Sequence, residues 1–384
     1  MNTRKTSRRV RVGTVVTFMG AIVAYLIGSG FATGQESMQY FSSFGAAGAT
    51  GALIITLAQY AYFTIVALRD GRNLRLKSTN EIFEYYCGKY LGKFFGIFAP
   101  AFFFCMYAVM LSGAGAALEQ HFGWNVQIGI FAMAIATLLT VMLGLDGLVS
   151  IMSKLGPVIV ALAIIVGIVG IVMNPGGIAD SNETLADIDV LQAAPNWAIS
   201  GFIFPGIGLL MLVPFLAGIG RKARNDREAA VSGFVGALTF VIAVAIVAFG
   251  LLANIGEVYD QQIPMLWIAD QVFAGSGLIF SIVLFAGIYT TAVPLLWVAV
   301  NRIESNDKST RARILALIGT VVAVLLAQVP FANLVNLLYP IAGYLTLILL
   351  VCIVVRQIRN ARARKKGIDV YDVPYARYPV DERA

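Results

Sequence analysis

The sequence predicts an all-α integral membrane protein with ten transmembrane helices, and its composition is the first sign of this class. Hydrophobic residues make up 59% and charged residues only 13% of the 384 residues, and the mean hydropathy is +0.80. So few polar residues do not suffice to cover the surface of a water-soluble globule of this size. We therefore expect the lipid bilayer to be the solvent of most of the chain.

Ten apolar runs are long enough to cross a bilayer, since one helical span needs about 20 apolar residues. They are continuous and rich in Gly and Ala, whereas membrane β-strands alternate apolar and polar residues over about ten positions. The expected spans are 12–43, 46–68, 93–118, 125–144, 147–173, 197–219, 228–254, 273–301, 314–329 and 331–356. The first follows a basic start without the small-residue cleavage site of a signal peptide, so we expect it to be retained.

The loops that connect these spans differ in charge, and basic loop residues stay on the cytoplasmic side. Nearly all of the 28 Lys and Arg residues lie in the two tails and in 69–93, 221–227 and 302–313. The opposite loops contain acidic residues but no Lys or Arg; they are 119–124, 174–196 and 254–272. We expect a multi-pass protein of the cell inner (plasma) membrane with both termini in the cytoplasm. Basic loops that face anionic lipid explain the net charge of +7, so the charge needs no nucleic-acid partner.

The ten spans divide into two halves of five with opposite orientation. The second span of each half is followed by a long connection with an amphipathic segment, at 81–90 and at 264–273. These connections fall on opposite sides of the membrane, as an inverted repeat requires. The expected parts are a basic N-tail at 1–11, the first repeat at 12–173, an extracellular loop at 174–196, the second repeat at 197–356 and a cytoplasmic C-tail at 357–384.

The first span of each half contains residues that weaken a helix. Gly28 and Gly30 each cost about 1 kcal/mol relative to Ala in a helix centre, and Pro205, next to Gly206, removes a backbone donor. Close helix packing explains any single glycine. Two such clusters in matched positions instead predict that the first and sixth helices are discontinuous around a binding cavity at the bilayer midplane.

The string Gly-Ser-Gly-Phe-Ala-Thr-Gly-Gln-Glu at 28–36 resembles the first-span signature of the YkvI-like membrane proteins. These are similar to the amino acid, polyamine and organocation superfamily, which has the LeuT-type fold with a repeat of five plus five helices. The resemblance implies that Ser29 and Gly30 offer amides to a substrate carboxylate. It also implies that Phe202, Phe204, Gly206 and Tyr107 line the site. The expected substrate-binding set further includes Gly28 at the break, and Tyr25, Phe31 and Tyr289, whose rings could help cage a quaternary amine.

The same resemblance implies a sodium site between the first and eighth spans. Its ligands would be the hydroxyls of Thr290 and Thr291 and the carbonyls of Ala24, Ile27 and Gly287. The spacing i, i+3, i+4 from Gly287 places the two threonines on one helical face. Threonines in membrane helices also commonly bond their own i−4 carbonyl, which is the alternative interpretation.

Two charged residues inside spans are candidates for a gate or for coupling, because charges in a membrane are costly and tend to be functional. Lys154 either extends to the cytoplasm or, as the resemblance implies for some relatives, replaces the sodium ion and couples transport to protons. Glu36 lies about two turns beyond the break in a straight helix. There it would serve as an external gate, contact a substrate amine, or cap the end of the span.

These features favour a secondary active transporter of a small zwitterionic solute, most simply an amino acid, that works by alternating access as a Na⁺ symporter. The partners would be the solute, Na⁺ or H⁺ and the lipid bilayer, with no resident cofactor. The alternatives are proton coupling through Lys154, a betaine or other quaternary amine held by aromatic rings, and a membrane sensor or scaffold that transports nothing. The sequence has no phosphate loop and no metal-ligand spacing, so we expect no enzyme.

Overall fold

The computed structural model describes residues 10–74, 76, 81–143, 148–304, 306, 309–367 and 370–371, with only the backbone at 29, 143 and 148–156. Helices dominate these residues, and the described part of the chain contains no strand. The first expected span consists of three helices, α1 (Val12–Leu26), α2 (Ser29–Thr33) and α3 (Gln35–Tyr40). The first of the two expected breaks is therefore present, because α1 and α2 are separate helices.

The remaining expected spans are each occupied by a helix. These are α4 (Gly45–Asn73), α5 (Glu81–Phe122), α6 (Val126–Leu143), α7 (Leu148–Met173), α9 (Trp197–Ile219), α10 (Asp226–Ala253), α13 (Ser276–Asn301), α14 (Thr310–Leu326) and α15 (Phe331–Lys365). Among the described residues, 6 helices are long and apolar enough to cross a membrane, and Val12–Leu26 and Val126–Met142 are shorter apolar helices. The prediction of an all-α, multi-pass membrane protein is confirmed.

The connections carry short helices that the span prediction leaves open. The loop 174–196 contains α8 (Gly177–Asp187), bent by 88° from the end of α7. The amphipathic segment at 264–273 contains α12 (Pro264–Asp270), preceded by α11 (Ile255–Val258). Its counterpart at 81–90 forms the start of α5, which is kinked at Gly88. Each half of the chain thus has a short helix before its third span, as the inverted repeat predicts.

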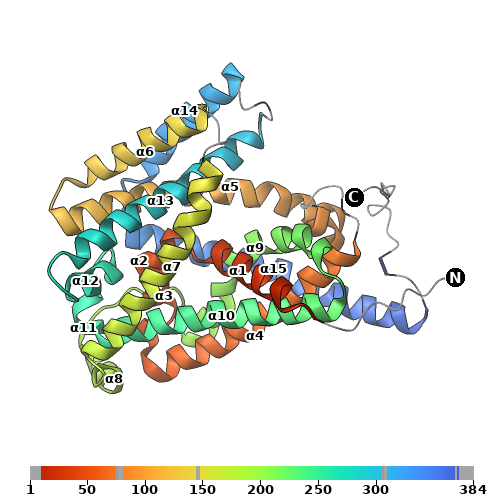
Figure 1. The fold of residues 1–384 in the computed structure, drawn as a ribbon, viewed down its shortest axis with the longest axis horizontal. Coiled ribbons are helices and arrows are strands. Elements are labelled where there is room, and N and C mark those ends of the chain that lie inside the picture. The colour runs from red at the N-terminus through yellow and green to blue at the C-terminus, as the bar shows by residue number, and fades with distance from the viewer. Residues whose placement is uncertain are drawn as a thin grey trace.

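The two ends of the helix bundle differ in charge. At the basic end, Arg72 of α4 pairs with Asp226 of α10 at 2.6 Å, and Arg11 before α1 pairs with Glu228 at 3.2 Å. The acidic end carries α8, α11 and α12. Figure 1 shows α8, α11 and α12 on the left and the C-terminal part of α15 on the right. The chain segments that the sequence predicts to share a membrane side therefore gather at the same end.

The basic end also holds the C-terminal part of the chain. α15 continues to Lys365, beyond the span end predicted at 356. Asp70 of α4 is buried and accepts hydrogen bonds from Tyr86 (2.8 Å), Gln357 (2.6 Å) and Tyr371 (3.1 Å). Burial and the neighbouring carboxylate of Asp70 raise the pKa of the Tyr371 hydroxyl. The start of the predicted C-tail is therefore helical and Tyr371 docks on the bundle, while 372–384 lie outside the described residues.

The helices pack in two groups around the broken first span. In one group α4 packs against both α9 and α10, and α10 packs against α1. In the other, α5 packs against α6 and α13, and α6 against α14. α15 contacts α9 in the first group and α5 in the second, and α13 reaches α2. The short helix α2 thus contacts α13 and α5 of the second group, while α3, which follows it, contacts α10 and α9 of the first.

The sixth span corrects one prediction, because α9 is one helix from Trp197 to Ile219 and has no break at Pro205. Pro205 has no N–H to donate to the carbonyl of Gly201 four residues earlier. Instead, Gln59 of α4 donates its Nε2 to this carbonyl at 3.0 Å, and Thr56 donates its hydroxyl at 3.4 Å. Side chains of the neighbouring helix satisfy the freed acceptor, so the helix does not need to unwind.

This account predicts that the role of Gln59 depends on Pro205. Gln59→Leu should lower the free energy of unfolding by about 1–3 kcal/mol, because it leaves a buried carbonyl without its main partner. In a Pro205→Ala background, the restored amide of residue 205 bonds the same carbonyl, and Gln59→Leu should cost much less. Thermal unfolding in detergent of the four proteins of this double-mutant cycle measures the coupling. Equal costs in both backgrounds would contradict the account.

Candidate functional site

The break in the first span exposes backbone polar groups in the middle of the bundle. α1 ends at Leu26, Ile27 and Gly28 are extended, and α2 begins at Ser29. The last carbonyls of a helix and its first amides have no partner within the helix. Among the described residues, the amide of Ile27 bonds the carbonyl of Val23, while the carbonyl of Ile27 accepts no backbone hydrogen bond. The break therefore offers free hydrogen-bonding groups beside a short helix.

Gly34 determines where the chain goes after α2. Its φ of 86° lies in the left-handed region, which glycine adopts without steric cost. α3 begins directly after it, so the chain does not continue outward as a straight helix. A Cβ on Gly30 would overlap Oε1 of Glu36 and would lie 3.1 Å from Oη of Tyr339. Glu36 thus lies beside Gly30 at the break rather than two turns beyond it, and its predicted role in gating or coupling stays a prediction.

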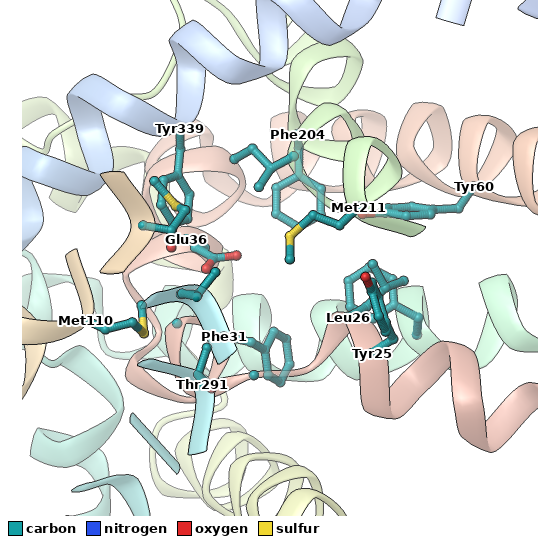
Figure 2. A pocket seen from close by; sticks show the side chains of 17 residues that line it. Tyr25, Leu26, Phe31, Glu36, Tyr60, Met110, Phe204, Met211, Thr291 and Tyr339 are labelled. Atoms are coloured by element: carbon teal, nitrogen blue, oxygen red, sulfur yellow. The ribbon is translucent and has the colours of Figure 1, made fainter. Parts of the chain in front are cut away.

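A cavity of about 130 Å³ opens at this break. Gly28 and Gly30 contribute backbone, and Glu36, Thr291 and Ile207 contribute side chains from three further helices. Most of the wall is aromatic or thioether: Tyr25, Phe31, Tyr60, Phe204, Phe240, Tyr339, Met106, Met110 and Met211. Figure 2 shows the carboxylate of Glu36 pointing toward the middle of the ring formed by the labelled side chains. We call this space the central cavity.

Glu36 is the only charged residue that lines the central cavity within the described part of the chain. Its side chain is hydrogen-bonded to Tyr339 of α15. No Lys, Arg or His lines the cavity among the described residues. A carboxylate in such a position is unfavourable without a partner, so the site favours a cationic group or a proton near Glu36.

Two further cavities continue from the central cavity toward the basic end. The first has about 350 Å³ and shares Tyr25 and Met211 with the central cavity. The second has about 380 Å³, shares Gly96 with the first and includes Glu84 and Arg302. Tyr25 and Phe215 stack with ring centroids 4.4 Å apart and an interplanar angle of 15°. This aromatic pair lies where the central cavity meets the next cavity toward the basic end.

Amide side chains tie together the elements on the acidic side of the central cavity. Gln35 of α3 donates its Nε2 to the carbonyl of Gln261 at 2.6 Å. Gln39 donates to the carbonyl of Ala332 at 3.0 Å, and the amide of Ala332 donates to Oε1 of Gln262 at 3.0 Å. These bonds join α3, the segment before α12 and the start of α15. Hydrogen bonds thus tie these elements together on the acidic side, while Tyr25 and Met211 lie between the central cavity and the next cavity on the basic side.

The structure places four of the predicted substrate-binding residues outside the central cavity, which corrects the prediction for them. Phe202 is 49% exposed on the outer surface of α9. Gly206 faces α15, where a Cβ would lie 2.8 Å from the Cα of Gly343. The hydroxyls of Tyr107 and Tyr289 bond Thr137 (2.7 Å) and Thr140 (2.6 Å) of α6. Tyr107, Tyr289 and Gly206 therefore contact neighbouring helices, and Phe202 faces outward, so none of the four lines the break.

The predicted sodium ligands are only partly brought together. A Cβ on Gly28 would lie 3.6 Å from Oγ1 of Thr291, so this threonine lies at the break. Thr290 and Thr291 both donate their hydroxyls to the carbonyl of Gly287, at 2.9 and 3.0 Å. A hydroxyl that donates in this way keeps its lone pairs for a cation. Ile27 is buried and Ala24 lies one turn earlier on α1, so the sodium site stays a prediction.

Two predicted residues lie outside the part that the structure describes in full. Ser29 begins α2, and only its backbone is described. Lys154 lies in α7, and its side chain is outside the described residues, so its predicted role in gating or coupling stays a prediction.

Sequence reasoning missed several residues of the cavity wall. Tyr60 of α4, Phe240 of α10 and Tyr339 of α15 all line it, as do Met106 and Met110 of α5. Each lies within an apolar membrane helix, where the residues are hydrophobic on every face. No periodic pattern separates a cavity-lining aromatic residue there from one that faces lipid.

Comparison with known proteins agrees with this architecture. No family model matches the chain. Two proteins of Bacillus subtilis (strain 168) are similar over most of their length. Uncharacterized protein YyaD is 27% identical over 341 residues, which cover 88% of this chain and 95% of that protein. Uncharacterized membrane protein YkvI is 23% identical over 332 residues, which cover 85% of this chain and 91% of that protein.

Solved structures share the fold at low sequence identity. Mhp1 in an inward-facing conformation matches with a TM-score of 0.57 and 13% identity, over 95% of this chain and 80% of that chain. MhsT in complex with L-phenylalanine matches with a TM-score of 0.55 and 19% identity, over 88% of each chain. A manganese transporter of Eremococcus coleocola, bound to an aromatic bis-isothiourea compound, matches with a TM-score of 0.56 and 14% identity. The match covers 98% of this chain and 86% of that chain.

The fold and the comparisons together define the class: a multi-pass, all-α membrane protein with the LeuT-type fold. Within that class the chain is similar to the membrane protein YkvI, as the string at 28–36 predicts. The prediction that the chain is not an enzyme agrees with these neighbours, one of which is named as a transporter.

Proposed function

We propose that the chain is a secondary active transporter that moves a small organic solute by alternating access to the central cavity. One observation carries the proposal: a cavity lies at a broken helix, with hydrogen-bonded amide side chains on its acidic side and the stacked Tyr25–Phe215 pair toward the next cavity on its basic side. Discontinuous helices with free backbone groups are the usual binding sites of such transporters. Closing one side while the other opens then requires only local rearrangement of these two barriers.

The size and chemistry of the central cavity favour an amino acid. A protein cavity of about 150 Å³ holds benzene, so the 130 Å³ here suit a solute of similar size or smaller. The first amides of α2 suit a carboxylate, and Glu36 suits an ammonium group. The bound L-phenylalanine of MhsT, a structural neighbour, supports the same class. The alternative substrate is a betaine held by Tyr25, Phe31 and Phe204. Competition by unmethylated amino acids would distinguish it from an amino acid.

We place the basic end in the cytoplasm and the protein in the inner membrane, because basic loops stay on that side. Sodium is the proposed coupling ion, bound between the break and Thr290 and Thr291 of α13. Support comes from the position of Thr291 beside Gly28. Proton coupling through Lys154 is the alternative outcome of the experiments below.

Flux through reconstituted vesicles tests this function directly. Purified protein in proteoliposomes should accumulate a labelled amino acid when a sodium gradient points inward, and accumulation should collapse when sodium ionophores remove the gradient. Accumulation driven by a pH gradient, and lost in Lys154→Ala, would replace sodium by protons. Binding without flux of any solute would contradict the proposed function and favour a sensor.

The sodium site makes a separate prediction for stability. Sodium should raise the melting temperature relative to potassium, because a ligand at about 100 times its Kd stabilises the folded state by about 2.7 kcal/mol. Thr291→Ala and Thr290→Ala should each remove most of this rise. Thr320→Ala of α14 is the matched control, since Thr320 is buried and donates to its own helix at 2.8 Å in the same way. An unchanged sodium response in the first two variants would contradict the site.

A further inference from the structure

The placement of Glu36 determines the charge of the central cavity. From the sequence, the two breaks contain neither acidic nor basic residues, which argues against a strongly cationic substrate. The left-handed turn at Gly34 changes this balance, because it returns Glu36 to the break beside Gly30. Among the described residues, the cavity then has one acidic group and no basic group.

The surroundings of Glu36 leave it able to pair with a ligand. One bond from Tyr339 engages the carboxylate, which has two oxygens and about four acceptor positions. The facing elements contribute Met110 of α5, Thr291 of α13 and Phe204 of α9, none of which is charged. Figure 2 shows the carboxylate directed toward the centre of the cavity rather than toward the protein wall.

The rest of the wall suits the apolar body of an amine. Aromatic faces from Tyr25, Phe31 and Phe204 attract a cation by their quadrupoles. The thioethers of Met110 and Met211 are flexible and adapt to different apolar shapes. Within the described wall, a carboxylate on the ligand would meet only neutral hydrogen-bond donors. An amine therefore does not need a carboxylate in order to bind.

We propose that Glu36 is the charge-selecting residue of the central cavity, and that the substrates are small protonated amines with an apolar body, whether or not they carry a carboxylate. This inference rests on the proposed transporter function and extends its substrate class. A neutral solute of the same shape leaves the carboxylate without a partner. It should therefore bind about 10- to 150-fold more weakly than the amine.

Matched probes test this inference by binding alone. Isobutylamine, isobutanol and valine share one apolar body and differ in the amine and the carboxylate. Calorimetric titration and thermal stability should rank isobutylamine and valine above isobutanol by roughly tenfold or more. Glu36→Gln keeps the shape and the bond from Tyr339 but should bring isobutylamine and isobutanol within about twofold. Glu36→Asp keeps the charge and should keep the preference.

Glu257→Gln is the control, because Glu257 is exposed at the acidic end and undergoes the same chemical change. Equal binding of isobutylamine and isobutanol to the unmodified protein would overturn the proposal, as would an amine preference that survives in Glu36→Gln. Binding of valine without binding of isobutylamine would overturn the extension to amines. Amine binding through Glu36 without flux in proteoliposomes would instead contradict the proposed transport function and leave this inference standing.

Discussion

Gly30→Ala should lower substrate affinity and transport by roughly 5- to 150-fold. A Cβ at this position would overlap Oε1 of Glu36 and would lie 3.1 Å from Oη of Tyr339. Either the carboxylate turns away from the cavity or α15 shifts outward. Overpacking of this kind costs about 1–3 kcal/mol, and each 1.4 kcal/mol changes an equilibrium constant about tenfold. Uptake of a labelled substrate by proteoliposomes and binding in detergent both measure the loss.

Gly28→Ala is the matched control for this prediction. The two glycines flank the start of α2, but a Cβ on Gly28 would meet only Thr291, at 3.6 and 3.9 Å. Such distances are ordinary contacts, and the φ of −107° at Gly28 suits any residue. Gly28→Ala should therefore keep affinity within about threefold, well below one tenfold step. Equal losses of affinity in both variants would show that a general weakening of the break causes them, rather than displacement of the Glu36 side chain.

Tyr25→Ala should uncouple transport from the ion gradient. The Tyr25 ring lines both the central cavity and the cavity toward the basic end, and it stacks on Phe215, so we expect the pair to act as the barrier between them. A stacked pair contributes about 0.5–1.5 kcal/mol, so its loss raises the population with an open barrier by roughly 2- to 12-fold. Removal of the ring also joins the two cavities directly.

The expected result is a faster downhill efflux together with a collapse of gradient-driven accumulation. Phe215→Ala should produce the same pattern more weakly, because Tyr25 still fills the space between the cavities. Phe202→Ala on the same helix is the control, since Phe202 is exposed on the outer surface of α9. If Tyr25→Ala accumulates substrate like the unmodified protein, the stacked pair is not a barrier to the solute.

The class, the spans and the first break follow from the sequence because their signals are local. Apolar length predicts a span, and two glycines within three residues at 28–30 predict a weak point in a helix. The position of Glu36 does not follow. It depends on the left-handed turn at Gly34, which only the packing of α2 and α3 against their neighbours fixes.

The sixth helix shows a second limit of local signals. Pro205 predicts a break, but Gln59, far away in the sequence, supplies the hydrogen bond that keeps α9 continuous. The aromatic residues show a third limit. Phe202 and Phe204 lie two positions apart on α9, one facing outward and one facing the cavity. Only the rotation of the helix decides which is which, because the sequence is apolar around the whole helix.

The central claim is that one cavity is reached from both sides of the membrane in turn, and thiol accessibility tests it most directly. The three native cysteines, Cys87, Cys105 and Cys352, are replaced and Ile207, which lines the central cavity, becomes the single Cys. An impermeant thiol reagent is then applied to oriented vesicles from either side. The account predicts labelling from both sides during turnover, and protection by substrate in each case. Labelling from one side only, whatever solute or ion is present, would contradict alternating access.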